Sequence, residues 1–276
     1  MGKTAFSITT VTFSWFGLIM TAAILAGCII NWWHIRLRKE DPDRLLDLTL
    51  YSIPVGIIAA RIYYVVVNWQ MYADEPNEIF MIWHGGLAIH GALIGVILTV
   101  WIYSQVYRIS FWRWSDIVAP GLVFGQAIGQ WGNFINQDTF GYPTDVPWGI
   151  YIDYAYRPLG YEQFDFFHPT FLYECGWDIV VFIILAAISW IIARKPDKLV
   201  PGSLFLLYII LYSAGRLVIE GIRLDSEMLG DWRLAQVVST IAMVWAGFLM
   251  LWRNYNYKMQ NRIKTGYIGK KGGGPY

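Results

Sequence analysis

The stretch FLYECGWDIVVFIILAAISWIIA, residues 171–193, is apolar over nearly its whole length. A transmembrane helix needs about 20 consecutive, mostly apolar residues, so this stretch predicts a helix that crosses a membrane. Further runs of this kind lie roughly at 13–33, 47–68, 86–106, 115–132, 202–222 and 233–252. The sequence therefore predicts an all-α polytopic membrane protein with about seven transmembrane helices, the fourth of them short.

The composition favours the same class of protein. Of the 276 residues, 56% are hydrophobic and 15% are charged, whereas soluble domains carry about 25% charged residues. Aromatic residues make up 17%, which suits a chain with two lipid–water interfaces where Trp and Tyr anchor. Cys28 and Cys175 belong to no Cys/His cluster, so neither a disulfide framework nor a zinc site is indicated. We expect the lipid bilayer around the chain and no nucleic-acid partner.

Basic residues are concentrated on one side of the predicted membrane. Most Lys and Arg lie in the loops after the first, third and fifth spans and in the C-terminal segment. Cytoplasmic loops carry such an excess, so we expect the N-terminus outside and the C-terminus in the cytoplasm. We expect residues 1–252 to form a single membrane domain, with a small extracytoplasmic head at roughly 133–170, between the fourth and fifth spans. Residues 253–276 form a basic cytoplasmic tail in this interpretation.

The fourth span ends in GQAIGQWGNFINQ, residues 125–137, which is rich in amides. A polar group in lipid is costly because the hydrocarbon offers it no hydrogen-bond partner. We therefore interpret these side chains as the lining of the outer mouth of a polar cavity. They are Gln126, Gln130, Asn133, Asn136 and Gln137.

Ionisable residues also interrupt the apolar runs, and such residues usually face the interior of a bundle or a cavity. They are Arg61 in the second span, His90 near the start of the third, Glu174 at the start of the fifth, and Arg216 and Glu220 late in the sixth. Together with the amides they predict an outward-opening cavity that suits a charged lipid head group. The lipid's tails would remain in the bilayer.

Arg216 and Glu220 are four residues apart, so they share one helix face and can pair. Two interpretations are open at this point. The pair is a structural salt bridge, or Arg216 holds a phosphate with its planar fork while Glu220 orients it. Arg223, one turn further, can join the pair.

His90 has two interpretations as well, because a histidine in a span makes an interhelical hydrogen bond or serves chemistry. Glycines at 85, 86, 91 and 95 permit close helix packing or the approach of a ligand. The sequence contains no GxSxG, Walker or HExxH motif and no recognisable metal-ligand spacing.

Four motifs taken in order resemble a known family. They are HGGLAIHGALIG at 84–95, GQWGNFINQDTFG at 129–141, HPTFLYE at 168–174 and GRLVIEGIRLDS at 215–226. The ordered set resembles the bacterial phosphatidylglycerol:prolipoprotein diacylglyceryl transferases over nearly the whole chain. The resemblance implies transfer of the diacylglyceryl group of phosphatidylglycerol to a cysteine thiol in the lipobox of a prolipoprotein signal peptide. A thioether forms and glycerol phosphate leaves, with no metal and no cofactor.

The resemblance also implies roles for single residues. His90, Arg216 and Glu220 become the catalytic candidates. A free thiol has a pKa of about 8.5, so a base must help it attack at neutral pH, and His90 is the candidate base. Cations such as Arg216 would stabilise the anionic leaving group. The substrate-binding candidates are Arg61, Gln130, Asn133, Asn136, Asp138, Gly141, Tyr173, Glu174 and Arg223.

Two positions depart from the family signature, which ordinarily has Arg where this chain has Gln130 and Glu where it has Asp138. Gln brings no charge, and charge-assisted hydrogen bonds are about twice as strong as neutral ones. Three explanations are open: an engineered inactivating substitution, a diverged paralogue with weak or altered activity, or a compensated active enzyme. The alternative function is a lipid-binding membrane paralogue without catalysis. A transporter is disfavoured because the sequence shows no internal repeat.

Overall fold

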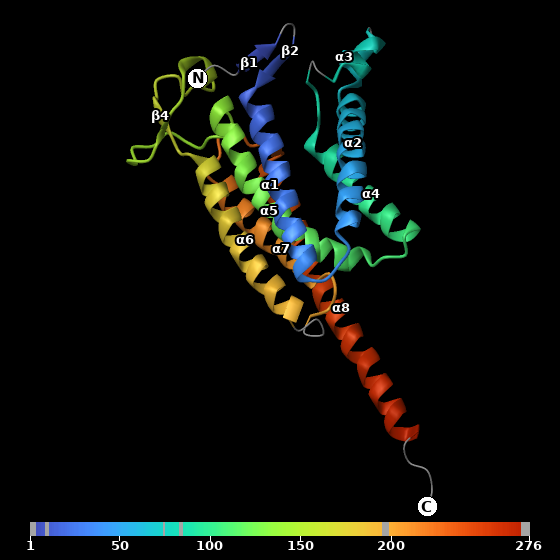
Figure 1. Ribbon diagram of the computed structural model, residues 1–276. Helices are drawn as coiled ribbons and strands as arrows, with labels where there is room; N and C mark the ends of the chain where they lie inside the picture. Colours follow the sequence, from blue (N-terminus) through green and yellow to red (C-terminus); the bar gives the residue numbers. More distant parts are fainter. Residues whose placement is uncertain (1–3, 9–10, 74, 83–84, 195–198, 272–276) are drawn as a thin grey trace, which may run out of the picture. The chain divides into compact units, whose positions relative to one another are not determined.

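The computed structural model describes residues 4–8, 11–73, 75–82, 85–194 and 199–271. The chain divides into two compact units (Figure 1). One unit is Ile35–Trp114, and the other combines Met1–His34 with Ser115–Tyr276. Each unit is described by itself.

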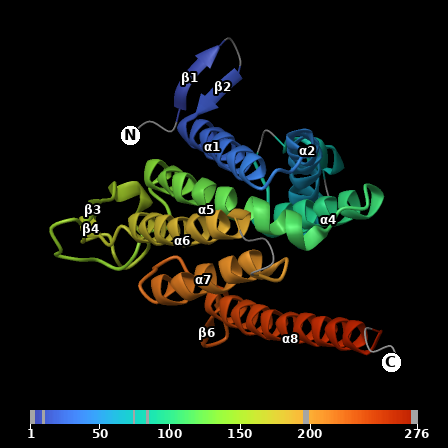
Figure 2. The ribbon, with the colours of Figure 1, turned by 60° about the horizontal axis from the view of Figure 1, so that its bottom comes forward.

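The larger unit is a set of long helices. A hairpin of β1 (Thr4–Ile8) and β2 (Val11–Ser14) leads into α1 (Trp15–Leu37). The other long helices that belong wholly or mostly to this unit are α5 (Phe111–Asn136), α6 (Thr170–Arg194), α7 (Ser203–Glu220) and α8 (Leu234–Lys271). Helix α7 lies between α6 and α8 and packs against both (Figure 2). The buried core joins α5, α6 and α7 through Ala119, Val123, Val181, Leu185, Leu204 and Tyr208.

The start of α7 is capped from a neighbouring helix. Gly202 precedes α7 with a φ of 95°, a conformation that suits glycine. Asp116 of α5 is buried and accepts hydrogen bonds from the backbone N–H groups of Gly202 at 2.7 Å and Phe205 at 2.8 Å. A carboxylate at a helix N-terminus satisfies free N–H groups and complements the helix dipole. This contact fixes α7, and with it Arg216 and Glu220, against α5.

A small folded segment connects α5 to α6 (Figure 1). It contains β3 (Ile150–Tyr151), the 3₁₀ turn η3 (Tyr154–Tyr156) and β4 (Phe166–Phe167). Strands β3 and β4 are antiparallel, with Ile150 opposite Phe167. Phe167 of β4 is buried in a cluster with Phe140 and Ile152. That this segment is an extracytoplasmic head stays a prediction.

The smaller unit pairs two helices. Helix α2 (Pro42–Val67) begins after Asp41, whose side chain accepts from the N–H of Asp43 at 3.0 Å, and Pro42 occupies the first helical position. The short helix α3 (Trp69–Tyr72) and the 3₁₀ turn η1 (Pro76–Phe80) connect α2 to α4 (Ile89–Val106).

Helix α4 packs against α2 at glycines. A Cβ atom on Gly91 would lie 2.8 Å from Cα of Ala60, and one on Gly95 would lie 3.0 Å from the carbonyl oxygen of Val55. Of the two functions open for these glycines, the structure shows close helix packing.

The predicted fold class is confirmed. A helix covers the core of each of the seven predicted spans. Within the described residues, six helices are long and apolar enough to cross a membrane, and α5, the predicted fourth span, is not among them. The number of spans therefore stays a prediction. Helix α8 continues to Lys271, through most of the predicted tail, and residues 272–276 of that tail lie outside the described part.

Candidate functional site

A buried carboxylate, Glu174, forms the centre of the candidate site. It lies near the start of α6, directly after HPTFLY, and is 8% exposed. Its Oε1 accepts from Arg216 and from Nη1 of Arg223, the latter at 3.2 Å. Its Oε2 accepts from Nε2 of Gln130 at 2.6 Å. Three donors from two other parts of the chain thus meet on one carboxylate.

Arg216 and Glu220 form the ion pair that their spacing predicts. Nη2 of Arg216 lies 3.0 Å from Oε2 of Glu220, and the Glu220 side chain is 2% exposed. The pairing is confirmed, while the functional role of the two residues stays a prediction. Because Arg216 also binds Glu174, it is held between two carboxylates on neighbouring helices.

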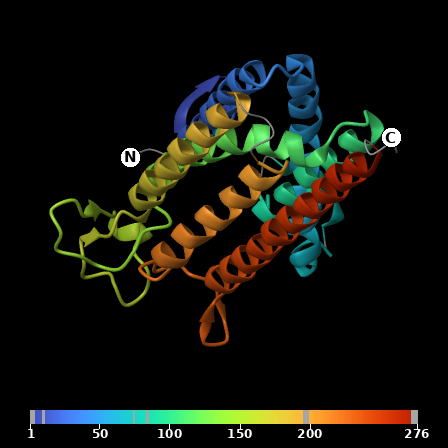
Figure 3. The same cartoon turned by 90° about the horizontal axis from the view of Figure 1, so that it is seen from below.

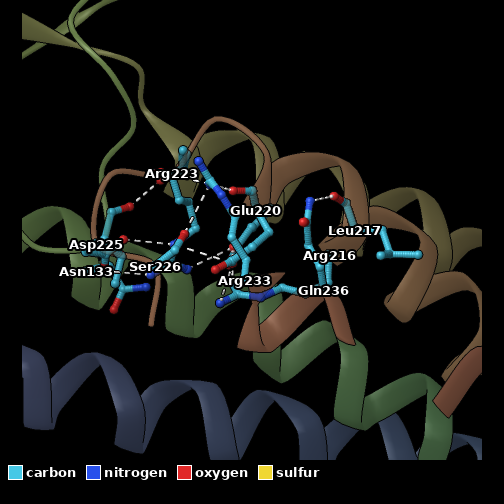
Figure 4. Close-up of polar contacts among 12 residues, drawn as sticks. Asn133, Arg216, Leu217, Glu220, Arg223, Asp225, Ser226, Arg233 and Gln236 are labelled. Atoms are coloured by element: carbon cyan, nitrogen blue, oxygen red, sulfur yellow. Dashed lines mark hydrogen bonds and ion pairs between the residues drawn. The ribbon is translucent and has the colours of Figure 1, made fainter. Parts of the chain in front are cut away.

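Arg223 joins the network just beyond the end of α7. Its Nε and Nη2 donate to the two oxygens of Asp225 at 3.0 Å and 2.8 Å, which is a bidentate pairing (Figure 4). Burial opposes the charge of Arg223, but Asp225, Glu174 and Glu220 outweigh it, so the pKa of Arg223 is raised above its ordinary value. Arg223 is therefore a fixed cation.

Arg233 ties the loop after α7 to the start of α8. It belongs to a hairpin of β5 (Met228–Leu229) and β6 (Trp232–Arg233), which projects where α8 begins (Figure 3). Its guanidinium donates to the backbone carbonyls of Glu220 and Arg223 and to Oγ of Ser226. These bonds hold the backbone that carries Arg223 (Figure 4).

Most of the amides around the end of the fourth predicted span bond to the protein itself. Gln126 accepts from the Tyr208 hydroxyl at 2.9 Å, and Asn133 donates to Oε1 of Gln130 at 2.8 Å. Gln130 therefore bridges Asn133 and Glu174. Gln137 exchanges two hydrogen bonds with Asp153, at 3.0 Å and 2.8 Å, and so fastens the segment after α5. The described residues provide no hydrogen bond to the side chain of Asn136.

Gly141 positions Arg223. Its N–H donates to the carbonyl of His168 at 2.9 Å, and Gly141 forms an isolated antiparallel bridge with Arg223. A Cβ here would lie 2.6 Å from the carbonyl oxygen of Ile222 and 2.8 Å from Cβ of His168. A side chain at 141 would thus push apart the backbones that precede Glu174 and Arg223.

Two other predicted site residues lie around this centre. The Tyr173 hydroxyl accepts from the Trp148 indole at 2.9 Å and lies 3.0 Å from Nδ1 of His168. Asp138 is exposed at the end of α5, and its backbone N–H donates to the carbonyl of Asn133.

A small pocket, here called the α6–α7 pocket, adjoins the network. Its lining residues are Glu174, Trp177, Asp178, Tyr212, Gly215, Arg216 and Ile219. Gly215 makes room for the Trp177 ring, because a Cβ there would overlap it. Asp178 is 2% exposed, and its Oδ2 has no hydrogen-bond partner among the described residues.

His90 and Arg61 belong to the smaller unit. His90 lies exposed in the first turn of α4, with its ring centroid 5.9 Å from that of Tyr63. Arg61 is buried, and its guanidinium donates to the carbonyls of Glu78, Ile79, Gly85 and Gly86 at 2.6–3.0 Å. A substrate-binding role for Arg61 stays a prediction. The hydrogen bonds of Arg61 hold the backbone of the turn before α4 in place.

Among the described residues, no group of three or more His, Cys, Asp or Glu side chains is placed to hold a metal ion. The larger unit instead gathers two arginines on shared carboxylates at the ends of two predicted spans. Such a cluster can exchange a carboxylate for a phosphate as the partner of its guanidinium groups. The fold and site therefore define a polytopic membrane protein with a buried cluster of arginines and carboxylates.

Comparison with known proteins identifies the family. The family model for prolipoprotein diacylglyceryl transferase matches residues 3–253. The chain belongs to the prolipoprotein diacylglyceryl transferase family.

Three curated relatives carry the name phosphatidylglycerol--prolipoprotein diacylglyceryl transferase. A protein from a Nostoc species is 46% identical over 254 residues, covering 91% of this chain and 89% of the relative. One from a Synechocystis species is 42% identical over 251 residues, covering 88% and 89%. One from Listeria innocua is 40% identical over 273 residues, covering 97% and 96%. These relatives do not favour the alternative of a non-catalytic paralogue.

Sequence reasoning missed several residues of this site. Asp225 pairs with Arg223 within the short loop after α7, and the partners of Arg233 become evident only when the start of α8 is placed beside that loop. Asp178 could have been predicted from the sequence as a site residue. It is a second acid, four residues after Glu174 on the same helix face of an otherwise apolar span.

Proposed function

We propose that this chain transfers the diacylglyceryl group of phosphatidylglycerol to the thiol of a lipobox cysteine in a prolipoprotein signal peptide. The observation that carries the proposal is the convergence of Arg216 and Arg223 on one oxygen of Glu174, in a chain of the transferase family. A phosphate oxygen that takes the place of Glu174 Oε1 would meet two guanidinium groups already held in position by Glu220 and Asp225.

The reaction requires one bond to form and one to break. The cysteine sulfur attacks the diacylglyceryl carbon that carries the phosphate oxygen, forming the C–S bond. The C–O bond breaks, its electron pair goes to the phosphate oxygen, and glycerol phosphate leaves. Arg216 and Arg223 stabilise the negative charge on that leaving group. His90 takes the thiol proton.

We place the chain in the bacterial cell membrane as a multi-pass protein with the N-terminus outside and the C-terminus in the cytoplasm. The distribution of Lys and Arg supports this orientation. In this orientation residues 133–170 lie outside, on the side where a secreted prolipoprotein presents its cysteine.

Release of glycerol phosphate tests the function. The purified protein is reconstituted with phosphatidylglycerol labelled in its head-group glycerol and given a lipobox peptide. Water-soluble label should appear with the cysteine peptide and stay at background with a peptide that has serine in its place. Equal release with both peptides, or none with either, would contradict the proposal.

A pair of variants localises the activity to the site. Arg216→Gln should lower the transfer rate by about 100-fold, because a charge-stabilising donor at the leaving group is lost. Arg108→Gln, which removes an exposed arginine outside the network, should leave the rate unchanged. Equal rates for the two variants would separate the activity from this network.

A further inference from the structure

Asp178 is a buried acidic residue of the larger unit that has no role in the proposed reaction. It lies four residues after Glu174 on α6, which is about 6 Å, or slightly more than one helical turn, further along the helix. Both residues line the α6–α7 pocket, together with Arg216. The Asp178 carboxyl is buried, and its Oδ2 lacks a hydrogen-bond partner among the described residues.

A buried carboxyl oxygen without a partner costs folding free energy, so its presence beside a pocket points to a donor that arrives with a ligand. Arg216 does not fill this role, because its guanidinium group bonds to Glu174 and Glu220. The pocket walls next to Asp178 are apolar or aromatic, formed by Trp177, Tyr212 and Ile219. The indole N–H of Trp177 donates elsewhere, to the carbonyl of Leu211 at 2.8 Å.

The chemistry of phosphatidylglycerol restricts which of its parts can reach Asp178. Its phosphate diester carries no proton and is repelled by a carboxylate, and its acyl esters only accept hydrogen bonds. The two hydroxyl groups of the head-group glycerol are its hydrogen-bond donors. An ammonium head group also carries hydrogen-bond donors, and Glu174 lines the pocket beside Arg216, so phosphatidylethanolamine is the competing lipid in the test.

We propose that the α6–α7 pocket binds the head-group glycerol of the lipid, with Asp178 accepting a hydrogen bond from its hydroxyl groups. This assignment rests on the proposed function for the identity of the lipid. Arg216 and Arg223 hold the phosphate, and Asp178, one turn further along α6, selects for hydroxyls beyond it. Asp178 is thus a specificity-determining residue.

The experiment compares two lipids that differ only at the head-group hydroxyls. Phosphatidylpropanol has the same phosphate charge as phosphatidylglycerol but carries a propyl group in place of glycerol. The binding of each to the full-length protein is measured in phosphatidylcholine nanodiscs without peptide. The wild type should bind phosphatidylglycerol about tenfold more tightly, the effect of one or two hydrogen bonds to a carboxyl.

Substitutions at Asp178 should remove this preference. Asp178→Leu should bring the affinity for phosphatidylglycerol down to that for phosphatidylpropanol, and Asp178→Asn, which keeps an accepting oxygen, should retain part of the preference. Ser189→Ala is the matched control, since Ser189 is a buried polar residue of the same helix whose hydroxyl lies 2.9 Å from Nδ1 of His34. It should keep the full preference.

Stability separates a role in recognition from a structural role. Because Asp178 has no hydrogen-bond partner at Oδ2 to lose, Asp178→Leu should leave the unfolding temperature unchanged or raise it. The assignment is overturned if the wild type does not distinguish the two lipids, or if the affinities for both fall together in Asp178→Leu. It is also overturned if phosphatidylethanolamine binds as tightly as phosphatidylglycerol.

The binding assay and the transfer assay can fail independently. Hydroxyl preference without any transfer would leave the α6–α7 pocket as a lipid head-group site and refute the proposed function. Transfer without hydroxyl preference would support the proposed function and refute the role of Asp178.

Discussion

Gln130 determines which residues neutralise the charge of Glu174. It is neutral, bonds to Glu174 and Asn133, and leaves Glu174 to be neutralised by Arg216 and Arg223. Both arginines are therefore shared between an internal carboxylate and the phosphate they are proposed to bind.

Gln130→Arg should strengthen the binding of phosphatidylglycerol. An arginine at 130 can pair with Glu174 and so free Arg216 for the phosphate, an effect of about 1 kcal/mol, or about fivefold in KM. The measurement is KM and kcat for transfer to a lipobox peptide. Gln130→Met, which keeps the length of the side chain without polarity, serves as control and should raise KM. An unchanged KM in Gln130→Arg would show that Glu174 does not compete with the phosphate.

His90→Gln should slow transfer at neutral pH by about 100-fold, the usual contribution of a general base. The loss should shrink as the pH rises towards 9, because the substrate thiol, with a pKa of about 8.5, then ionises unaided. The measurement is a pH–rate profile of variant and wild type. Wild-type rates at pH 7 would exclude His90 as the base.

Single residues also show how much of the candidate site could be predicted from the sequence. The Arg216–Glu220 pair followed from their spacing alone, because residues four apart meet on one helix. The involvement of Asp225 did not follow, since it depends on a loop whose backbone Arg233 holds. Arg61 donates to the carbonyls of a turn whose geometry no residue pattern reveals, and its role in substrate binding stays a prediction.

At the scale of helices, close packing depends on glycine where α4 meets α2. Gly91→Ala should destabilise the protein by about 1–3 kcal/mol, because the added methyl meets the backbone of Ala60. Gly176→Ala in α6, where no atom lies within 4 Å of the added Cβ, should be neutral or stabilising by up to about 1 kcal/mol. Thermal unfolding in detergent measures both. Similar midpoints for the two variants would contradict this packing.

The cap on α7 offers a second test at this scale. Asp116→Ala should lower stability by about 2 kcal/mol, since two buried N–H groups lose their acceptor. Asp41→Ala removes the more exposed cap of α2 and should cost about 1 kcal/mol or less. If both variants unfolded at the same temperature, burial would not strengthen the Asp116 contact.

Helix positions were predictable because each needs only a long apolar run. Their ends were less so, since Phe111 and Asn136 extend α5 beyond the apolar residues 115–132 at both ends. The division of the chain into two compact units was not predicted from the sequence.

For the whole molecule, the orientation in the membrane is open to direct test. A green fluorescent protein fused after Tyr276 should fluoresce, because the basic C-terminal segment is proposed to lie in the cytoplasm. Alkaline phosphatase at the same place should be inactive, and should be active when inserted after Leu159. The reverse pattern would invert the proposed topology.

The segment between α5 and α6 contains a point where the chain can be cut while its contacts remain. Leu159 is 93% exposed at a turn, while the backbone on both sides is fastened by the Gln137–Asp153 bonds, by the pairing of β3 with β4, and by Arg157 bound to Asp165. Cutting the peptide after Leu159 would sever none of these contacts. Residues 1–159 and 160–276 are thus natural halves for a split protein, in which one half supplies Gln130 and the other supplies Glu174, Arg216 and Arg223. Their reassembly would restore the site without a covalent link.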